Sequence, residues 1–188
     1  MKDVREIKME RTLKKIAYAF QRKRLTWGIG GSYLLKHYGL VNNVRDIDIV
    51  IAEEDIEGAL DILDFFGERR ELEQDAKFDT EVFVSYVIEG TVIDVMCNIK
   101  IIYNDSFYQY KFDKDAIAEE VFIEGQKYPI MHLEDWYVLY YYMGRNERLN
   151  VLDGYIKSGQ YFDFSRVEIL VSAQEVRSDI LKRLAQTF

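Results

Sequence analysis

The sequence predicts a mixed α/β (α+β) domain, in which helices flank a mixed sheet, followed by a helical C-terminal segment. Three observations predict this class. β-rich runs alternate with amphipathic helical stretches up to about residue 130. Two of these runs are separated only by Glu89-Gly90, the signature of a tight hairpin. Only helical patterns follow residue 130, so we expect a core of residues 1–130 with a helical segment of residues 131–188 packed on it.

The chain begins with a predicted amphipathic helix over residues 4–24, in which apolar residues repeat at helical spacing and Lys and Arg fill the other positions. Residues 26–31 are short and glycine-rich, which predicts a strand that ends in a tight turn. Ser32 stands where an N-cap would, ahead of a helix that stops at Gly39.

A buried strand is predicted at residues 47–51, which are β-branched and apolar apart from one aspartate. Residues 55–66 predict an amphipathic helix, closed by Gly67 as a C′ glycine. The remaining predicted elements are strands at 81–88, 91–99 and 107–112, a short helix or turn at 113–120, a segment at 125–130 that leads into a helix at 133–143, and helical stretches near 151–158 and 172–186.

Composition excludes several classes of protein. The 188 residues are 48% hydrophobic, which argues against disorder, and the single Cys excludes a disulfide framework and a Cys-based zinc cage. No apolar run approaches the roughly 18 residues needed to span a bilayer. Because the first residues lack the apolar core of a signal peptide, we expect a soluble cytoplasmic protein with no membrane partner.

Charge is spread unevenly along the chain. Residues 1–24 carry nine Lys or Arg and three Asp or Glu, a charge of +6, which leaves −14 on the rest of a chain whose total is −8. The basic helix is interpreted as a solvated face that covers one side of the sheet, and binding of RNA or an acidic partner is the alternative. The net charge therefore does not exclude a nucleic-acid partner.

The first segment with chemical potential is the turn Gly28-Ile29-Gly30-Gly31-Ser32. Glycines allow positive φ angles and a close approach of a ligand to the backbone, and the following helix directs its free N–H groups at the turn. Such a turn suits phosphate, although it is neither a Walker A loop nor a dinucleotide fingerprint. A tight turn with an N-cap is the alternative.

The second segment is Arg45-Asp46-Ile47-Asp48-Ile49. On a strand, Asp46 and Asp48 point to the same side, so two carboxylates share one face. Because they repel each other, burial of the pair needs a cation, and Mg²⁺ is the usual choice of such oxygen ligands. A solvated strand end with Asp46 paired to Arg45 is the alternative.

The third segment contains Asp94 in the apolar run Thr91-Val92-Ile93-Asp94-Val95-Met96. A charge in such a strand is costly unless it is paired, neutralised or bound to metal. A structural salt bridge is one solution. The other is a triad with Asp46 and Asp48, in which three carboxylates hold two metal ions about 3.5–4 Å apart for phosphoryl transfer.

Together, the three segments resemble the nucleotidyltransferase superfamily of the DNA polymerase β type. Its pattern is a Gly-Ser turn that opens a helix, Asp-x-Asp on the next strand and a third Asp on a later strand. Thirteen residues separate Ser32 from Asp46, and Asp94 lies in a Val-Ile-Asp-Val context. Residues 25–100 are similar to small bacterial members: the minimal, lincosamide and aminoglycoside nucleotidyltransferases and the toxin-like branch of abortive-infection systems.

The resemblance implies metal-dependent transfer of a nucleoside monophosphate from a nucleoside triphosphate, such as ATP, to an acceptor hydroxyl with release of pyrophosphate. The implied nucleotide-binding residues are Gly30, Gly31, Ser32 and Arg45, and the implied catalytic residues, which also bind two Mg²⁺ ions, are Asp46, Asp48 and Asp94. Among these, Asp94 would also help to deprotonate the acceptor.

The acceptor stays open at this point. A small cationic molecule such as an aminoglycoside suits the acidic remainder of the chain, a lincosamide-like molecule is comparable, and a tRNA or protein acceptor would use the basic helix. The sequence does not decide between a monomer and a homodimer. A non-catalytic nucleotide-binding or interaction protein with the same fold is the alternative, because Tyr140 stands where the resemblance leads to Lys, and Glu147-Arg148 departs from its Lys-Asp.

Other residues with chemical potential are predicted to be structural. The aromatic cluster Trp136, Tyr137, Tyr140, Tyr141 and Tyr142 has the spacing of a core or interface helix, with a cleft over a nucleotide base or a cationic acceptor as the alternative. His37 and His132 lack partners at metal-ligand spacing, and Cys97 is predicted to be an inert buried thiol.

Overall fold

The computed structural model describes residues 4–71, 76–104, 106–123, 125–172 and 177–187. Its strands are β1 (Trp27–Ile29), β2 (Asp46–Ile51), β3 (Glu68–Glu71), β4 (Val82–Ile88), β5 (Thr91–Cys97), β6 (Ile99–Tyr103), β7 (Ser106–Tyr110), β8 (Ile117–Ile123) and β9 (Gln126–Met131). Its helices are α1 (Val4–Lys23), α2 (Gly31–His37), α3 (Ile56–Phe66), α4 (Leu133–Met143), α5 (Asn146–Lys157), α6 (Phe164–Leu170) and α7 (Arg177–Ala185), with short 3₁₀ turns at Glu53–Asp55 and Lys114–Ala116.

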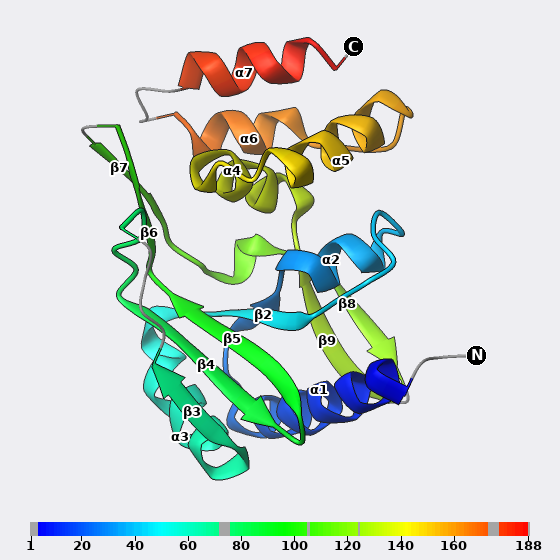
Figure 1. Cartoon of the computed structure of the whole chain (residues 1–188), viewed down its shortest axis with the longest axis vertical. Helices are drawn as coiled ribbons and strands as arrows, with labels where there is room; N and C mark the ends of the chain where they lie inside the picture. Colours follow the sequence, from blue (N-terminus) through cyan, green and yellow to red (C-terminus); the bar gives the residue numbers. More distant parts are fainter. Residues whose placement is uncertain (1–3, 72–75, 105, 124, 173–176, 188) are drawn as a thin grey trace.

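A seven-stranded mixed sheet forms the centre, in the order β3-β4-β5-β2-β1-β9-β8 (Figure 1). The pairs β2–β5 and β1–β9 are parallel, and the other neighbours are antiparallel. A separate two-stranded sheet consists of β6 and β7. The predicted mixed α/β class with flanking helices is therefore confirmed.

Helices cover the large sheet on both sides. α1 and α3 lie on one face, whereas α2 and the C-terminal helices lie beyond the other (Figure 1). The apolar stripe predicted for the first helix is buried, and consists of Leu13, Ile16, Ala17 and Phe20. In addition, the Thr12 hydroxyl lies 3.3 Å from the Ile88 carbonyl oxygen and 3.3 Å from the Thr91 hydroxyl, which ties α1 to the β4–β5 hairpin. The basic helix thus covers one side of the sheet, as predicted.

Two helix ends differ from the prediction. The N-cap of α2 is Gly30, not Ser32, and no side chain caps this end. Gly67 ends α3 but is extended, with φ −164°, and is not a left-handed C′ residue. Glycine is required there by close packing, because a Cβ would lie 2.5 Å from the Val87 carbonyl oxygen.

The hairpin at Glu89-Gly90 is confirmed, with φ angles of +51° and +81° at the two turn residues. The run predicted as one strand at 91–99 is interrupted at Asn98, whose φ is +49°, and the chain then leaves the large sheet for β6. β3 was not predicted, because its sequence Glu-Arg-Arg-Glu has no apolar alternation. The segment 113–120, expected as a short helix or turn, contains the 3₁₀ turn Lys114–Ala116, and its second half belongs to β8.

The chain after β9 is helical as predicted, although α5 begins five residues before the predicted 151–158 stretch and α6 was missed. α4 packs against both α5 and α6, and Arg183 of α7 donates to the Asp153 carboxylate of α5 at 2.6 Å. Residues 173–176 of the last predicted helix lie outside the described residues.

The division into two parts at residue 130 stays a prediction. No helix in the described ranges has the length and apolarity of a membrane span.

Candidate functional site

The sheet register brings the three predicted aspartates to neighbouring positions. Asp46 and Asp48 lie on β2 and share a face, because they are two residues apart. Asp94 on β5 is the direct partner of Asp48 in the parallel ladder, and paired residues on adjacent strands point to the same side. Ile47 and Ile49 point to the other side and are fully buried. All three carboxylates therefore belong to the sheet face opposite α1.

The glycine-rich turn meets these aspartates directly. Gly31 has φ +56°, and a Cβ there would lie 1.7 Å from Asp48 Oδ2, so only glycine leaves room for the carboxylate. The backbone N–H of Ser32 donates to the Asp48 side chain. The Ser32 hydroxyl donates to Asp46 Oδ1 at 3.5 Å. Both donors of Ser32 are thus directed at the aspartates.

Like charges and burial perturb the cluster. The pKa of Asp48 is raised to about 7, first by burial and then by the charges of Asp46 and Asp94, against the Ser32 N–H and the positive charge of Arg148. The pKa of Asp94 is also raised, chiefly by burial, while a hydrogen bond from the Ser85 side chain opposes the shift. Among the described residues, Asp94 Oδ1 is buried and has no hydrogen-bond partner. Negative charge in the cluster thus exceeds what its protein neighbours compensate.

These features fit a divalent cation. Several carboxylate oxygens, one of them without a partner, face the same space, and hard ions such as Mg²⁺ prefer oxygen ligands. Within the described ranges, however, no three His, Cys, Asp or Glu side chains are grouped closely enough to hold a metal as they stand. The aspartates instead interact with Ser32 and Ser85, because mutual repulsion disfavours closer approach of the three charges.

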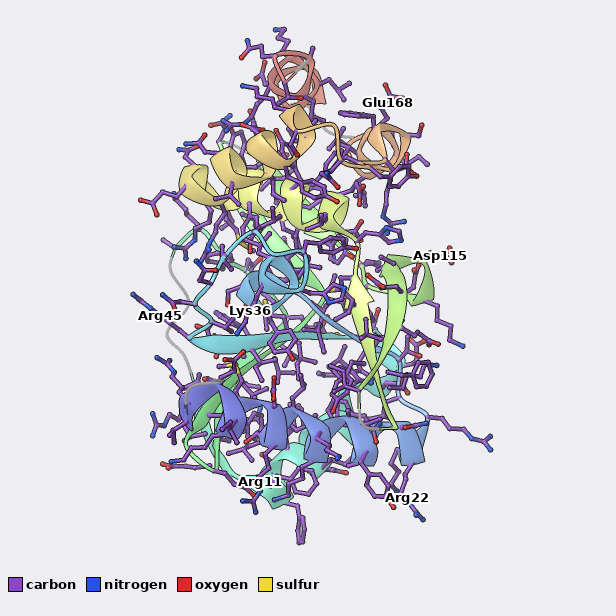
Figure 2. All side chains as sticks on the ribbon, turned by 90° about the vertical axis from the view of Figure 1, so that its right-hand side faces the viewer. Arg11, Arg22, Lys36, Arg45, Asp115 and Glu168 are labelled. Atoms are coloured by element: carbon purple, nitrogen blue, oxygen red, sulfur yellow. The ribbon has the colours of Figure 1, made fainter. Side chains whose placement is uncertain are left out.

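A cleft of about 1050 Å³ opens beside Asp46 and Ser32. One wall consists of the loop between α2 and β2, and the other of the connection from α4 into α5; its lining residues include Asn42, Asn43, Arg45, Gly144, Arg145, Asn146, Glu147 and Arg148. Arg45 lies at the start of β2, where Figure 2 labels it, and its carbonyl oxygen accepts from the Arg5 guanidinium at 2.9 Å. The predicted residues Ser32, Arg45 and Asp46 therefore share one cleft.

The aromatic cluster of α4 forms core, as predicted, because Trp136, Tyr137 and Tyr140 are almost completely buried. Trp136 packs directly on the turn at Gly30. Burial raises the pKa of Tyr140 most, and the negative charge of Asp48 raises it further. The positive charges of Arg148 and Arg145 lower it. Both the aspartates and the arginines therefore influence the hydroxyl of Tyr140.

The other candidates predicted to be structural have structural contacts. His37 lies 2.9 Å from a Glu119 carboxylate oxygen. His132 is the N-cap residue of α4 and lies 3.7 Å from Glu134. Cys97 is buried, and burial raises the pKa of its thiol to about 11, so it is inert at neutral pH.

Replacing Gly30 by Ala should destabilise the protein, because the new Cβ would lie 2.0 Å from the Trp136 ring. We expect a loss of about 1–3 kcal/mol in the free energy of unfolding, typical of overpacking. Gly154→Ala in exposed α5 is the matched control, since a Cβ there meets nothing within 4 Å; it should gain about 0.5–1 kcal/mol. Urea unfolding of both variants measures the difference, and equal effects would contradict this packing.

Neither a scan against known protein-family models nor a search of curated proteins finds a match for this chain. Solved structures do match. A protein of Thermotoga maritima described as a candidate nucleotidyltransferase has 24% identity and a TM-score of 0.61, over 79% of this chain and 92% of that one. The antibiotic-resistance factor ANT(2″)-Ia in solution has 17% identity and a TM-score of 0.57, over 95% and 97%. This chain has the nucleotidyltransferase fold.

A second structure with this fold, ANT(2″)-Ia in complex with adenylyl-2″-tobramycin, covers 91% of this chain with a TM-score of 0.54 and 16% identity. Two residues that act on the aspartates were not predicted as site residues: Ser85, which faces Asp94 across the β4–β5 ladder, and Arg148. The hairpin register could have indicated Ser85. The three-residue spacing of Arg145 and Arg148 could have indicated one helix face.

Proposed function

We propose that this protein is a metal-dependent nucleotidyltransferase that moves a nucleoside monophosphate from a nucleoside triphosphate to an acceptor hydroxyl. The observation that carries the proposal is the β2–β5 register, which pairs Asp48 with Asp94 and leaves Asp94 Oδ1 without a partner. Ser32 lies beside the same carboxylates at the edge of a large open cleft. A structural salt bridge would instead have placed a cation on Asp94.

In this mechanism, Asp46, Asp48 and Asp94 would hold Mg²⁺, which would supply Lewis-acid stabilisation of charge on the reacting phosphate. Ser32 and the turn at Gly30-Gly31 bind the triphosphate next to Arg45. The acceptor oxygen forms a bond to the α-phosphorus, and the bond from that phosphorus to the β-phosphate bridging oxygen breaks. The Asp94 carboxylate would take the proton of the acceptor hydroxyl, and pyrophosphate leaves.

A small, antibiotic-like molecule is the acceptor that we favour over a tRNA. The acidic remainder of the chain suits a cationic molecule. Helix α1 lies on the opposite sheet face from the aspartates (Figure 1), and only its first residues approach the cleft, where Arg5 contacts Arg45. A tRNA bound along α1 would therefore have to reach around the sheet. The adenylyl-2″-tobramycin in complex with ANT(2″)-Ia, an adenylylated aminoglycoside, illustrates such a product.

Pyrophosphate release tests the proposal. The protein is incubated with Mg²⁺, each of the four ribonucleoside triphosphates, and a panel of aminoglycosides, lincosamides and tRNA. We expect release with at least one acceptor, and none after chelation of the metal. If every combination is silent and Asp46→Asn binds nucleotide as the parent does, the protein is a non-catalytic nucleotide-binding protein.

Mg²⁺ should also stabilise the folded protein, because it neutralises carboxylates that repel each other. At a concentration ten times its Kd, the gain is about 1.4 kcal/mol, or about 3–6 °C in Tm for a chain of this size. Thermal unfolding in MgCl₂ is compared with NaCl at equal ionic strength. Asp94→Asn should lose most of this gain, and an equal gain in that variant would place the cation elsewhere.

A further inference from the structure

The wall of the cleft across from the aspartates carries positive charge that has no ion-pair partner among the described residues. Arg145 and Arg148 lie at the start of α5 and line the cleft together with Arg45. Within the described part of the chain, none of these guanidinium groups has a carboxylate at ion-pair distance. Other arginines of this protein are paired: Arg166 with Asp135 and Arg183 with Asp153.

Arg148 is half-buried, unlike its exposed neighbours in the same connection. A half-buried guanidinium has lost part of its hydration and needs a partner to compensate for it. Its charge reaches the site, because it lowers the pKa values of both Asp48 and Tyr140. Arg148 therefore lines the same cleft as Ser32 and Asp46, and its side chain is partly shielded from solvent.

The cleft, of about 1050 Å³, has polar or basic residues on both walls that an anion could contact. Ser32 and Arg45 belong to the α2–β2 side, while Arg145 and Arg148 belong to α5. The cleft also contains acidic Asp46 and Glu147, and the metal proposed above would offset the charge of Asp46. Planar guanidinium groups bind phosphate oxygens in pairs, so two arginines a helical turn apart suit a polyphosphate.

We infer that Arg148, assisted by Arg145, binds the terminal phosphates of the nucleotide and so connects α5 to the sheet. This inference rests on the proposed function, since the ligand is the triphosphate of that reaction. The positive charge that would bind the phosphates thus comes from the arginines at the start of α5. Position 140, where the family resemblance leads to Lys, has a buried tyrosine hydroxyl that supplies no charge. Nucleotide binding therefore holds the two walls of the cleft together through the polyphosphate.

A calorimetric measurement of the binding of inorganic tripolyphosphate in the presence of Mg²⁺ tests this inference without catalysis. We expect Arg148→Ala to weaken binding about 10–100-fold, the loss of a charge-assisted pair of hydrogen bonds, and Arg145→Ala to weaken it less. Arg148→Lys should recover part of the loss, which a merely structural role would not predict. Arg11→Ala is the matched control, because Arg11 lies on α1, far from the cleft (Figure 2).

Amide hydrogen exchange gives a second readout. Tripolyphosphate should slow exchange in α5 of the parent and leave α5 unchanged in Arg148→Ala, with circular dichroism confirming that the variant is folded. If Arg148→Ala binds tripolyphosphate like the parent, the inference is overturned while pyrophosphate release still supports the proposed function. If the parent releases pyrophosphate but binds no tripolyphosphate, the inference also fails. If it neither releases pyrophosphate nor binds nucleotide, the proposed function fails as well.

Discussion

Asp46→Asn is expected to lower nucleotidyl transfer by about 1000-fold while the protein remains folded. The substitution keeps the size of the side chain and removes the charge that would hold Mg²⁺ beside Ser32. Loss of metal-based stabilisation of the transition state costs several kcal/mol, and about 4 kcal/mol corresponds to 1000-fold in rate. Transfer of label from the α-phosphate of the triphosphate to the acceptor measures the rate.

Asp61→Asn is the matched control for this experiment. Asp61 is an exposed aspartate of α3, on the sheet face away from the cleft, so its neutralisation removes one charge without touching the site. Transfer by this variant should equal that of the parent. Activity of Asp46→Asn within a factor of ten of the parent would show that the carboxylate is not a metal ligand in the reaction.

Asp135→Ala is expected to destabilise the protein by about 3–5 kcal/mol, the cost of removing one partner of a buried ion pair. The Asp135 side chain is completely buried. It accepts hydrogen bonds from the Arg166 guanidinium, with Nη2 at 2.8 Å, and from the Tyr110 hydroxyl. The change would leave a partly buried guanidinium and a buried hydroxyl without this partner, and would remove the hydrogen bonds that link α4 to α6 and β7. Denaturant unfolding measures the loss.

A surface pair provides the control for Asp135. Lys182 and Asp179 form an exposed ion pair at 3.6 Å on α7, and Asp179→Ala should cost less than about 1 kcal/mol. The double variant Asp135→Leu/Arg166→Met should recover much of the loss, because it removes the stranded charge together with its partner. Equal losses for Asp135→Ala and Asp179→Ala would contradict the assignment of Asp135 as the anchor of the helical segment.

Local patterns predicted the parts of the fold that local chemistry determines. The Glu89-Gly90 turn, the buried stripe of α1 and the position of Asp46 and Asp48 on one face follow from residue type and spacing. β3 did not follow, because a sheet edge made of Glu and Arg has no apolar pattern. The break at Asn98 did not either, because a positive φ at a non-glycine residue is set by the departure of β6 into a second sheet.

The candidate site was predictable where it depends on the order of strands and turns. Asp94 was selected because a lone charge in an apolar strand needs an explanation, and the sheet then paired it with Asp48. The start of α2 differs from the prediction: its N-cap is Gly30, on which the ring of Trp136 packs from α4, a contact that local sequence does not reveal. From the sequence, Arg148 is only a departure from the Lys-Asp of the resembling family. The fold is needed to show that the start of α5 and Asp46 line the same cleft.

The most direct test of the central claim is a crystal structure with Mg²⁺ and a non-hydrolysable nucleoside triphosphate. We expect metal density coordinated by Asp46, Asp48 and Asp94, with the triphosphate between Ser32 and the start of α5. Nucleotide bound elsewhere, or bound in this cleft with no metal at the three aspartates, would contradict the claim that these carboxylates form a metal-dependent nucleotidyl-transfer site.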